Sequence, residues 1–287
     1  MPLAVVFKGP EGIVLAADSR STLQALKPLP PGAVAAMPPG VPTPSAMLVP
    51  AYYDNARKLL GVQGQKYVGV VTFGAGAIGT TEPRTVYGFM PEFQEHLVQQ
   101  AADKRLKVEE VAQEIGTFFT ERWQDAGMPK PTSHPDEQMF FYVAGFDEGE
   151  AYGRVFEVRV PDAPVPMEQS KNTFGLSMGG QNGYIARLLQ GFDERAAQIA
   201  ATQLHLDAAQ VAALVTEWKT QLSVPIPWQF LPLQDGVDLC TFIVTTTSII
   251  QNWTVDIRGV GGEIDVAVID RVDGLRVVNQ KQIHSWE

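Results

Sequence analysis

The sequence has very little cysteine and no long apolar run. Cys240 is the only cysteine among 287 residues, which excludes an intrachain disulfide and is typical of a cytoplasmic protein. No apolar stretch reaches the roughly eighteen residues that a membrane-spanning helix needs, so we expect no membrane contact. The N-terminus also lacks a basic region followed by an apolar stretch, and we therefore expect no secretory signal.

Positive charge and histidine are also scarce. The 22 Lys and Arg residues against 32 Asp and Glu residues give a net charge of −10. This balance argues against a nucleic-acid-binding surface, which needs a basic patch. The histidines form no metal-ligand pattern, so we expect no metal and no cofactor; they are His96, His134, His205 and His284.

Two short apolar runs stand at the beginning of the chain. Residues 3–7 and 12–18 flank a Gly/Pro turn, which predicts a β-hairpin. The second run leads straight into Asp18 and Arg20, and charged groups that enter an apolar region must be paired or used. This strand end is either a functional site or an exposed end with a loose ion pair.

The remaining apolar patterns predict strands and helices in groups rather than in strict alternation. We expect strands at 67–73, 139–146, 153–160 and 173–178, and helices at 81–97, 108–126, 184–201 and from Asp207 onward. Grouping of this kind favours an α+β sandwich with antiparallel sheets inside and helices outside.

Several short segments together resemble proteasome β-type subunits and their bacterial relatives. The family's order is matched by 16–20 (AADSR), 55–60 (NARKLL), 72–76 (TFGAG), 236–239 (GVDL) and 261–269 (GGEIDVAVI). The matches span most of the chain. The resemblance implies a four-layer αββα sandwich, the fold of the N-terminal nucleophile (Ntn) hydrolases.

The resemblance also implies a site. In that family an N-terminal threonine attacks the scissile carbonyl with its own α-amine as base. Matched by motif, Asp18 is the orienting acid, Lys58 the buried lysine and Gly74 the donor of the oxyanion amide, while Arg20 and Thr22 lie on the substrate-side strand. We expect Asp18 and Lys58 to form a direct ion pair, because each is costly to bury alone.

The nucleophile itself is missing from this pattern. Its place falls at Pro2, or at Met1 if the hairpin turn is shorter, and neither has a hydroxyl or thiol. No Thr, Ser or Cys occurs before Ser19, and we expect no propeptide whose removal exposes one.

The family's supporting serines are missing as well. The expected Gly-Ser reads Gly180-Gln181, and the expected Asp-x-x-Ser reads 257–260 (IRGV), with Asp256 one residue out of register. We therefore predict that the fold is kept while the standard threonine chemistry is lost.

These observations favour a proteasome-type subunit of a self-compartmentalising assembly that is not an active threonine peptidase. An alternative is an active peptidase or amidase that uses the Pro2 amine after removal of Met1, and a third hypothesis is a monomeric binding protein. The resemblance implies homo-oligomeric rings, often stacked, and by analogy a peptide substrate or an ATP-dependent partner.

Two stretches look inserted into a single domain that spans residues 1–287. Residues 24–50 hold eight prolines, which exclude a helix interior or a central strand and predict a long extended loop. This loop is a surface excursion or, alternatively, a lid or subunit contact over the pocket. The second insertion is helical, covers about 193–232, and has no assigned role.

Overall fold

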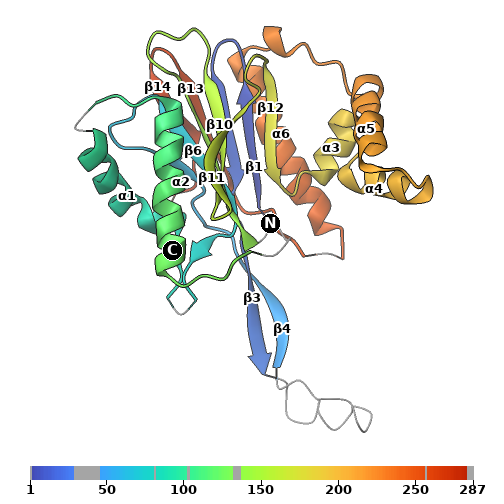
Figure 1. Ribbon diagram of the computed structural model, residues 1–287, viewed down its shortest axis with the longest axis horizontal. Coiled ribbons are helices and arrows are strands. Elements are labelled where there is room, and N and C mark those ends of the chain that lie inside the picture. Colours follow the sequence, from blue (N-terminus) through green and yellow to red (C-terminus); the bar gives the residue numbers. More distant parts are fainter. Residues whose placement is uncertain are drawn as a thin grey trace.

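The computed structural model describes residues 2–28, 46–80, 82–101, 104–131, 137–255 and 257–282, with the backbone alone at 23–28, 46–48 and 50. Two five-stranded antiparallel sheets lie face to face, and helices cover both outer faces (Figure 1). The predicted α+β sandwich with four αββα layers is confirmed.

The first sheet contains the N-terminal hairpin. Its order is β12 (Gly175–Gly180), β1 (Leu3–Lys8), β2 (Ile13–Asp18), β13 (Ile264–Asp270) and β14 (Gly274–Asn279). The predicted hairpin is confirmed, with Ala4 opposite Ala17. β2 is the central strand of this sheet. Its last residue, Asp18, therefore lies at one end of the sheet, between neighbouring strands and opposite Ile264 of β13.

The second sheet contains two strands that the sequence did not predict, one at each edge. Its order is β11 (Ala163–Gln169), β10 (Arg154–Val160), β9 (Met139–Gly145), β6 (Val68–Gly74) and β5 (Leu59–Gly61). The unexpected strands are β5, which has only three residues, and β11, which holds Pro164 and Pro166. Strand β11 is an edge strand, where missing N–H donors are tolerated.

Helices α1 (Val86–Ala101) and α2 (Val108–Asp125) cover the second sheet, while α3 (Gly183–Gln190) and α6 (Leu233–Asn252) cover the first (Figure 1). The predicted helical insertion contains α4 (Glu194–Gln203), α5 (Ala208–Leu222) and the short helix η3 (Trp228–Phe230). Among the described residues, the helices lack the length or apolarity that a membrane crossing requires.

Two predicted helix boundaries are wrong. The first helix begins at Val86 rather than 81, because β8 (Arg84–Thr85) pairs with β7 (Ala77–Ile78) and Thr85 Oγ1 then accepts the Gly88 N–H at 3.2 Å. The helix expected over 184–201 is broken at Gly191, whose φ of 80° ends α3. The expected N-cap of α5 is confirmed, since the Asp207 side chain accepts from Gln210 N.

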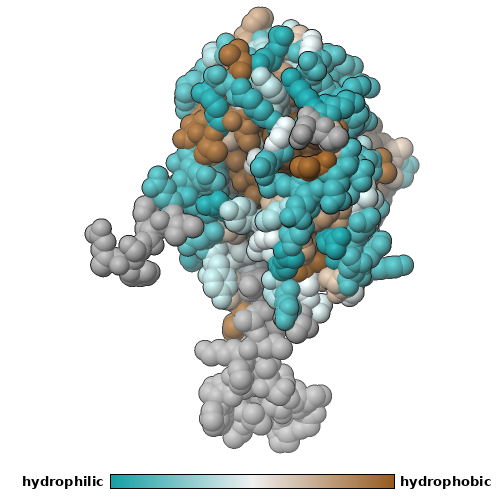
Figure 2. Space-filling model, turned by 90° about the vertical axis from the view of Figure 1, so that its left-hand side faces the viewer, coloured by the Kyte–Doolittle hydropathy of each residue, from teal (hydrophilic) through white to brown (hydrophobic). Residues whose placement is uncertain are grey.

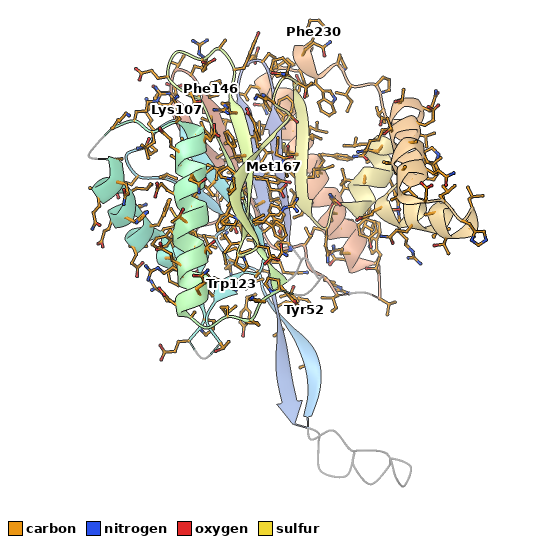
Figure 3. All side chains as sticks on the ribbon, in the orientation of Figure 1. Tyr52, Lys107, Trp123, Phe146, Met167 and Phe230 are labelled. Carbon is orange, nitrogen blue, oxygen red and sulfur yellow. The ribbon has the colours of Figure 1, made fainter. Side chains whose placement is uncertain are left out.

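Alternating strand residues build three apolar layers. In β1, Ala4 and Val6 face the second sheet, whereas Val5 and Phe7 face α6. A third layer joins the second sheet to α1 and α2, where Trp123 is buried near the end of α2 (Figure 3). The second sheet covers one face of β1 and β2, and α6 covers the other. A charged side chain at the ends of these strands is therefore shielded from water.

The proline-rich region forms an arm rather than only a loop. Strands β3 (Ser21–Pro28) and β4 (Ala46–Tyr53) pair antiparallel and project from the sandwich (Figure 1). The loop prediction is thus wrong for the ends of 24–50, because a two-stranded ribbon leaves one side of each strand unpaired and tolerates proline there. The expected loop over residues 29–45 lies outside the described residues.

Candidate active site

Asp18 ends β2, and backbone amides from three segments hold its carboxylate. Oδ1 accepts from Leu3 N at 3.0 Å, and Oδ2 accepts from Arg20 N at 3.0 Å and from Gly261 N at 3.1 Å. The residue is 1% exposed. A charge buried this deeply is costly without such donors, and the three amides offset part of that cost.

Lys58 lies directly before β5 and supplies the opposite charge. Its Nζ is 2.9 Å from Asp18 Oδ1 and also donates to the carbonyl oxygen of Arg20. Burial lowers the pKa of the Lys58 amine, and the neighbouring Asp18 carboxylate opposes this shift. The predicted direct ion pair between Asp18 and Lys58 is confirmed.

Arg20 and Thr22 lie on either side of Ser21 and make different contacts. The Arg20 guanidinium binds Asp54 through two hydrogen bonds, at 2.6 and 2.8 Å, which raise the pKa of Arg20 and lower that of Asp54. The Thr22 hydroxyl donates to the carbonyl oxygen of Arg258 at 3.3 Å. Of these strand residues, only Ser21 lines the central cavity described below.

Gly74 ends β6 in a backbone conformation that favours glycine. Its φ is +83°, and a Cβ at this position would lie 2.3 Å from the carbonyl oxygen of Gln138. The backbone geometry therefore requires glycine at this position. Whether its amide serves as an oxyanion donor stays a prediction.

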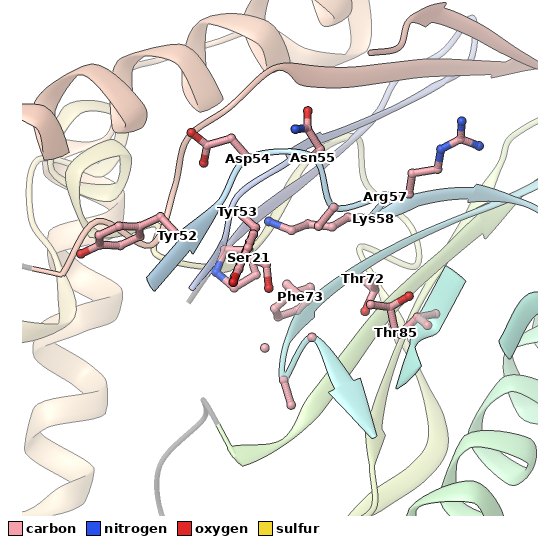
Figure 4. A pocket seen from close by; sticks show the side chains of 16 residues that line it. Ser21, Tyr52, Tyr53, Asp54, Asn55, Arg57, Lys58, Thr72, Phe73 and Thr85 are labelled. Atoms are coloured by element: carbon pink, nitrogen blue, oxygen red, sulfur yellow. The ribbon is translucent and has the colours of Figure 1, made fainter. Parts of the chain in front are cut away.

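A cavity of about 680 Å³ brings three of the predicted residues together. Pro2, Lys58 and Gly74 all line it. Figure 4 shows Lys58, Tyr53 and Ser21 pointing into the same space. Phe73 and Val86 add apolar surface to its wall. The site thus combines a buried cation with an apolar surface, an arrangement suited to a small organic ligand.

Glutamines occupy the region where supporting serines were expected. Gln181 N donates to the carbonyl oxygen of Pro2 at 3.1 Å, and the Gln181 side chain accepts from Gln251 Nε2. Gln251 Oε1 in turn accepts from Val260 N at 2.9 Å. This chain of amides joins β12, α6 and the segment before β13 without a hydroxyl. Asp256, considered as a substitute acid, lies outside the described residues.

Sequence reasoning missed a second buried ion pair beside the first. Lys281 Nζ lies 2.7 Å from Asp265 Oδ2 and donates to the carbonyl oxygen of Ala56 at 2.7 Å. The only sequence signal was an acidic residue inside the apolar strand 264–269, and nothing marked Lys281. The carboxylate partner of Arg20, Asp54, was missed for the same reason, since no motif contains it.

The histidines stand apart from this cavity. His96 Nε2 pairs with Glu114 Oε2 at 2.7 Å between α1 and α2, and His205 follows α4 with a φ of 52°. His134 and His284 lie outside the described residues. Within the described ranges, no group of three or more His, Cys, Asp or Glu side chains is arranged to hold a metal ion.

No family model matches the sequence, and no curated protein matches it. The structure is similar to a solved Gly-1 mutant of Anbu from Hyphomicrobium sp. strain MC1, with a TM-score of 0.52. The match covers 98% of this chain and 86% of that one at 16% identity. Anbu is a proteasome-related bacterial protein with an Ntn-hydrolase-like fold, and at this identity the likeness shows the fold alone.

This match corrects the family that the short motifs indicated. Membership of the proteasome β-type subunits is not supported, because no family model matches and the structural likeness is to Anbu, a distinct family. The motif segments are short, and segments such as 16–20 occupy strand ends that the shared fold itself constrains.

Proposed function

We propose that this protein is a subunit of a homo-oligomeric, self-compartmentalising assembly whose Ntn-type cavity binds a peptide-like ligand but is not a threonine peptidase. We take residues 1–287 as one domain, with the β3–β4 arm and the α4–α5 pair as insertions at about 24–50 and 193–232. The observation that carries this proposal is that the residue directly before β1, which lines the same cavity as Lys58, is Pro2.

The chemistry of a threonine peptidase requires a hydroxyl beside a base. Pro2 lines the cavity directly before Leu3, whose amide binds Asp18, and a proline side chain has no hydroxyl. Thr72 also lines the cavity, but its hydroxyl donates to the carbonyl oxygen of Phe140 at 3.0 Å. The Ser19 hydroxyl is buried and donates to backbone carbonyls. The Thr72 and Ser19 hydroxyls are therefore already engaged. Among the described residues, the other aliphatic hydroxyls that line the cavity are those of Ser21 and Thr85, neither of which lies at the position of the N-terminal nucleophile.

Assembly is supported by apolar side chains that the described residues leave exposed. Edge strand β14 exposes Val277 and Val278, and the α4–α5 pair exposes Ile199, Leu204 and Leu222. Hydrophobic areas are also visible on the face that carries α1 (Figure 2). An edge strand with exposed valines is a template for pairing with another chain, and clustered apolar surface favours association.

Sedimentation velocity tests the assembly. We expect species whose masses are multiples of 31.3 kDa. A single species of one chain mass across the working concentration range would contradict the oligomeric part of the proposal.

Peptidase assays test the cavity. We expect no turnover of fluorogenic peptides and no covalent adduct with epoxyketone or β-lactone inhibitors. Turnover that disappears in Lys58→Ala would overturn the non-peptidase reading.

A second candidate is a peptidase or amidase that uses the Pro2 amine. The position of Pro2 in the same cavity as Lys58 and Gly74 favours it. This mechanism requires that processing expose the Pro2 nitrogen, which would then act as a base or nucleophile. Intact-mass spectrometry decides the matter, because a protein that retains Met1 has no free amine at Pro2.

A further inference from the structure

The central cavity shares a wall with a second hollow of about 550 Å³. Arg57, Asn55 and Thr85 line both. The central cavity is also lined by the apolar side chains of Phe73 and Val86. The second hollow is lined in addition by charged and polar side chains. A ligand that reaches from one hollow into the other therefore passes from apolar to polar surroundings at Arg57.

Arg57 is half-buried and has no carboxylate partner among the described residues. Its Nη1 donates to Tyr87 Oη at 3.0 Å, and its guanidinium stacks on the same ring at 4.8 Å from the centroid. Arg20, by contrast, is neutralised by the two-point contact with Asp54. The tyrosine orients the Arg57 guanidinium without cancelling its charge, so the remaining N–H donors are available to a ligand.

Two hydroxyls beside Arg57 are also set to donate. Tyr87 Oη accepts from Arg57, and Thr85 Oγ1 accepts from Gly88 N at 3.2 Å. Since each hydroxyl already uses a lone pair as acceptor, its proton is left for a ligand. Lys281 in the second hollow is neutralised by Asp265, and Glu263 is the opposing negative charge there.

We propose that Arg57 forms an anion subsite that binds the carboxylate of a peptide-like ligand whose apolar part occupies the central cavity. The inference rests on the cavity's proposed role in ligand binding. A planar guanidinium presents paired N–H donors that match the two oxygens of a carboxylate, and partial burial strengthens the contact. Glu263 weakens the subsite by repulsion of the same anion.

The test uses N-acetyl-leucyl-leucine as the free acid and as its C-terminal amide, titrated into the full chain by calorimetry at pH 7. We expect the acid to bind about tenfold more tightly than the amide. Arg57→Gln should remove this preference, so that acid and amide bind equally, whereas Glu263→Gln should increase the preference for the acid. Arg84→Gln is the matched control, because Arg84 is an exposed arginine paired with Glu92 and should leave the ratio unchanged.

The outcomes separate the subsite from the cavity. Equal binding of acid and amide, unaffected by Arg57→Gln, would overturn the anion subsite while the cavity remains a binding site. Binding of neither probe would overturn both. A melting midpoint of Arg57→Gln equal to that of the parent protein shows that a lost preference reflects the missing guanidinium rather than unfolding.

Discussion

Lys58 Nζ lies 2.9 Å from Asp18 Oδ1 at a point where the lysine is 7% and the aspartate 1% exposed. Both side chains are almost fully buried, and each charge therefore depends on the other. Three backbone amides, those of Leu3, Arg20 and Gly261, also bind the Asp18 carboxylate.

Lys58→Met should destabilise the fold by on the order of 3 kcal/mol, because it leaves a buried carboxylate without its counter-charge. Urea unfolding followed by circular dichroism measures the loss. Lys219→Met is the control, because Lys219 is exposed on α5 and should change the free energy of unfolding very little. An unchanged midpoint for Lys58→Met would mean that the pair contributes nothing to stability.

Lys281→Met should lower the free energy of unfolding by an amount similar to that of Lys58→Met. The effects of the two substitutions should not be additive. Lys281 pairs with Asp265 and holds the carbonyl of Ala56, two residues before Lys58. Variants in one network commonly deviate from additivity by about 0.5–3 kcal/mol. A double-mutant cycle with Lys58→Met measures this term, and strict additivity would show that the two pairs act independently.

Gly74→Ala should destabilise by about 1–3 kcal/mol, because an alanine at a φ of +83° is strained and its Cβ meets the Gln138 carbonyl. Gly76→Ala is a close control, since a Cβ there meets only Ser21 Oγ, at 3.5 Å. Thermal melts of the two variants should differ clearly. Equal midpoints would contradict the conformation assigned to Gly74.

Asp54→Asn should reduce stability at neutral pH but not in acid. The Arg20 guanidinium holds the pKa of Asp54 below its ordinary 3.8, so the unfolded chain binds this proton first as the pH falls. The stabilisation is therefore present above pH 3.8 and is lost as the pH falls through the lower folded pKa. Because Asp54 is partly exposed, we expect a loss below about 1 kcal/mol. Melts of both proteins should converge in acid, and a constant difference across the range would refute the assignment.

Elements that depend on neighbouring residues were predicted correctly, whereas elements that depend on pairing with other strands were missed. The hairpin of β1 and β2 and the N-cap Asp207 were predicted, because both depend on residues that are close in the sequence. The edge strand β11 was missed because its two prolines weaken the local strand pattern, and pairing with β10 overrides that preference. The ribbon ends within 24–50 were missed for the same reason.

Some features of the candidate site were also evident from the sequence, and others only from the structure. The sequence by itself indicated that Asp18, at the end of an apolar strand, needs a partner, whereas Lys58 was named as that partner through the resemblance to proteasome β-type subunits. It also determined that Pro2 carries no hydroxyl. Only the tertiary structure placed Lys281 against Ala56 and left Arg57 in a wall between two hollows. Apolar periodicity is a property of neighbouring residues, whereas the partner of a charge depends on how distant segments pack together.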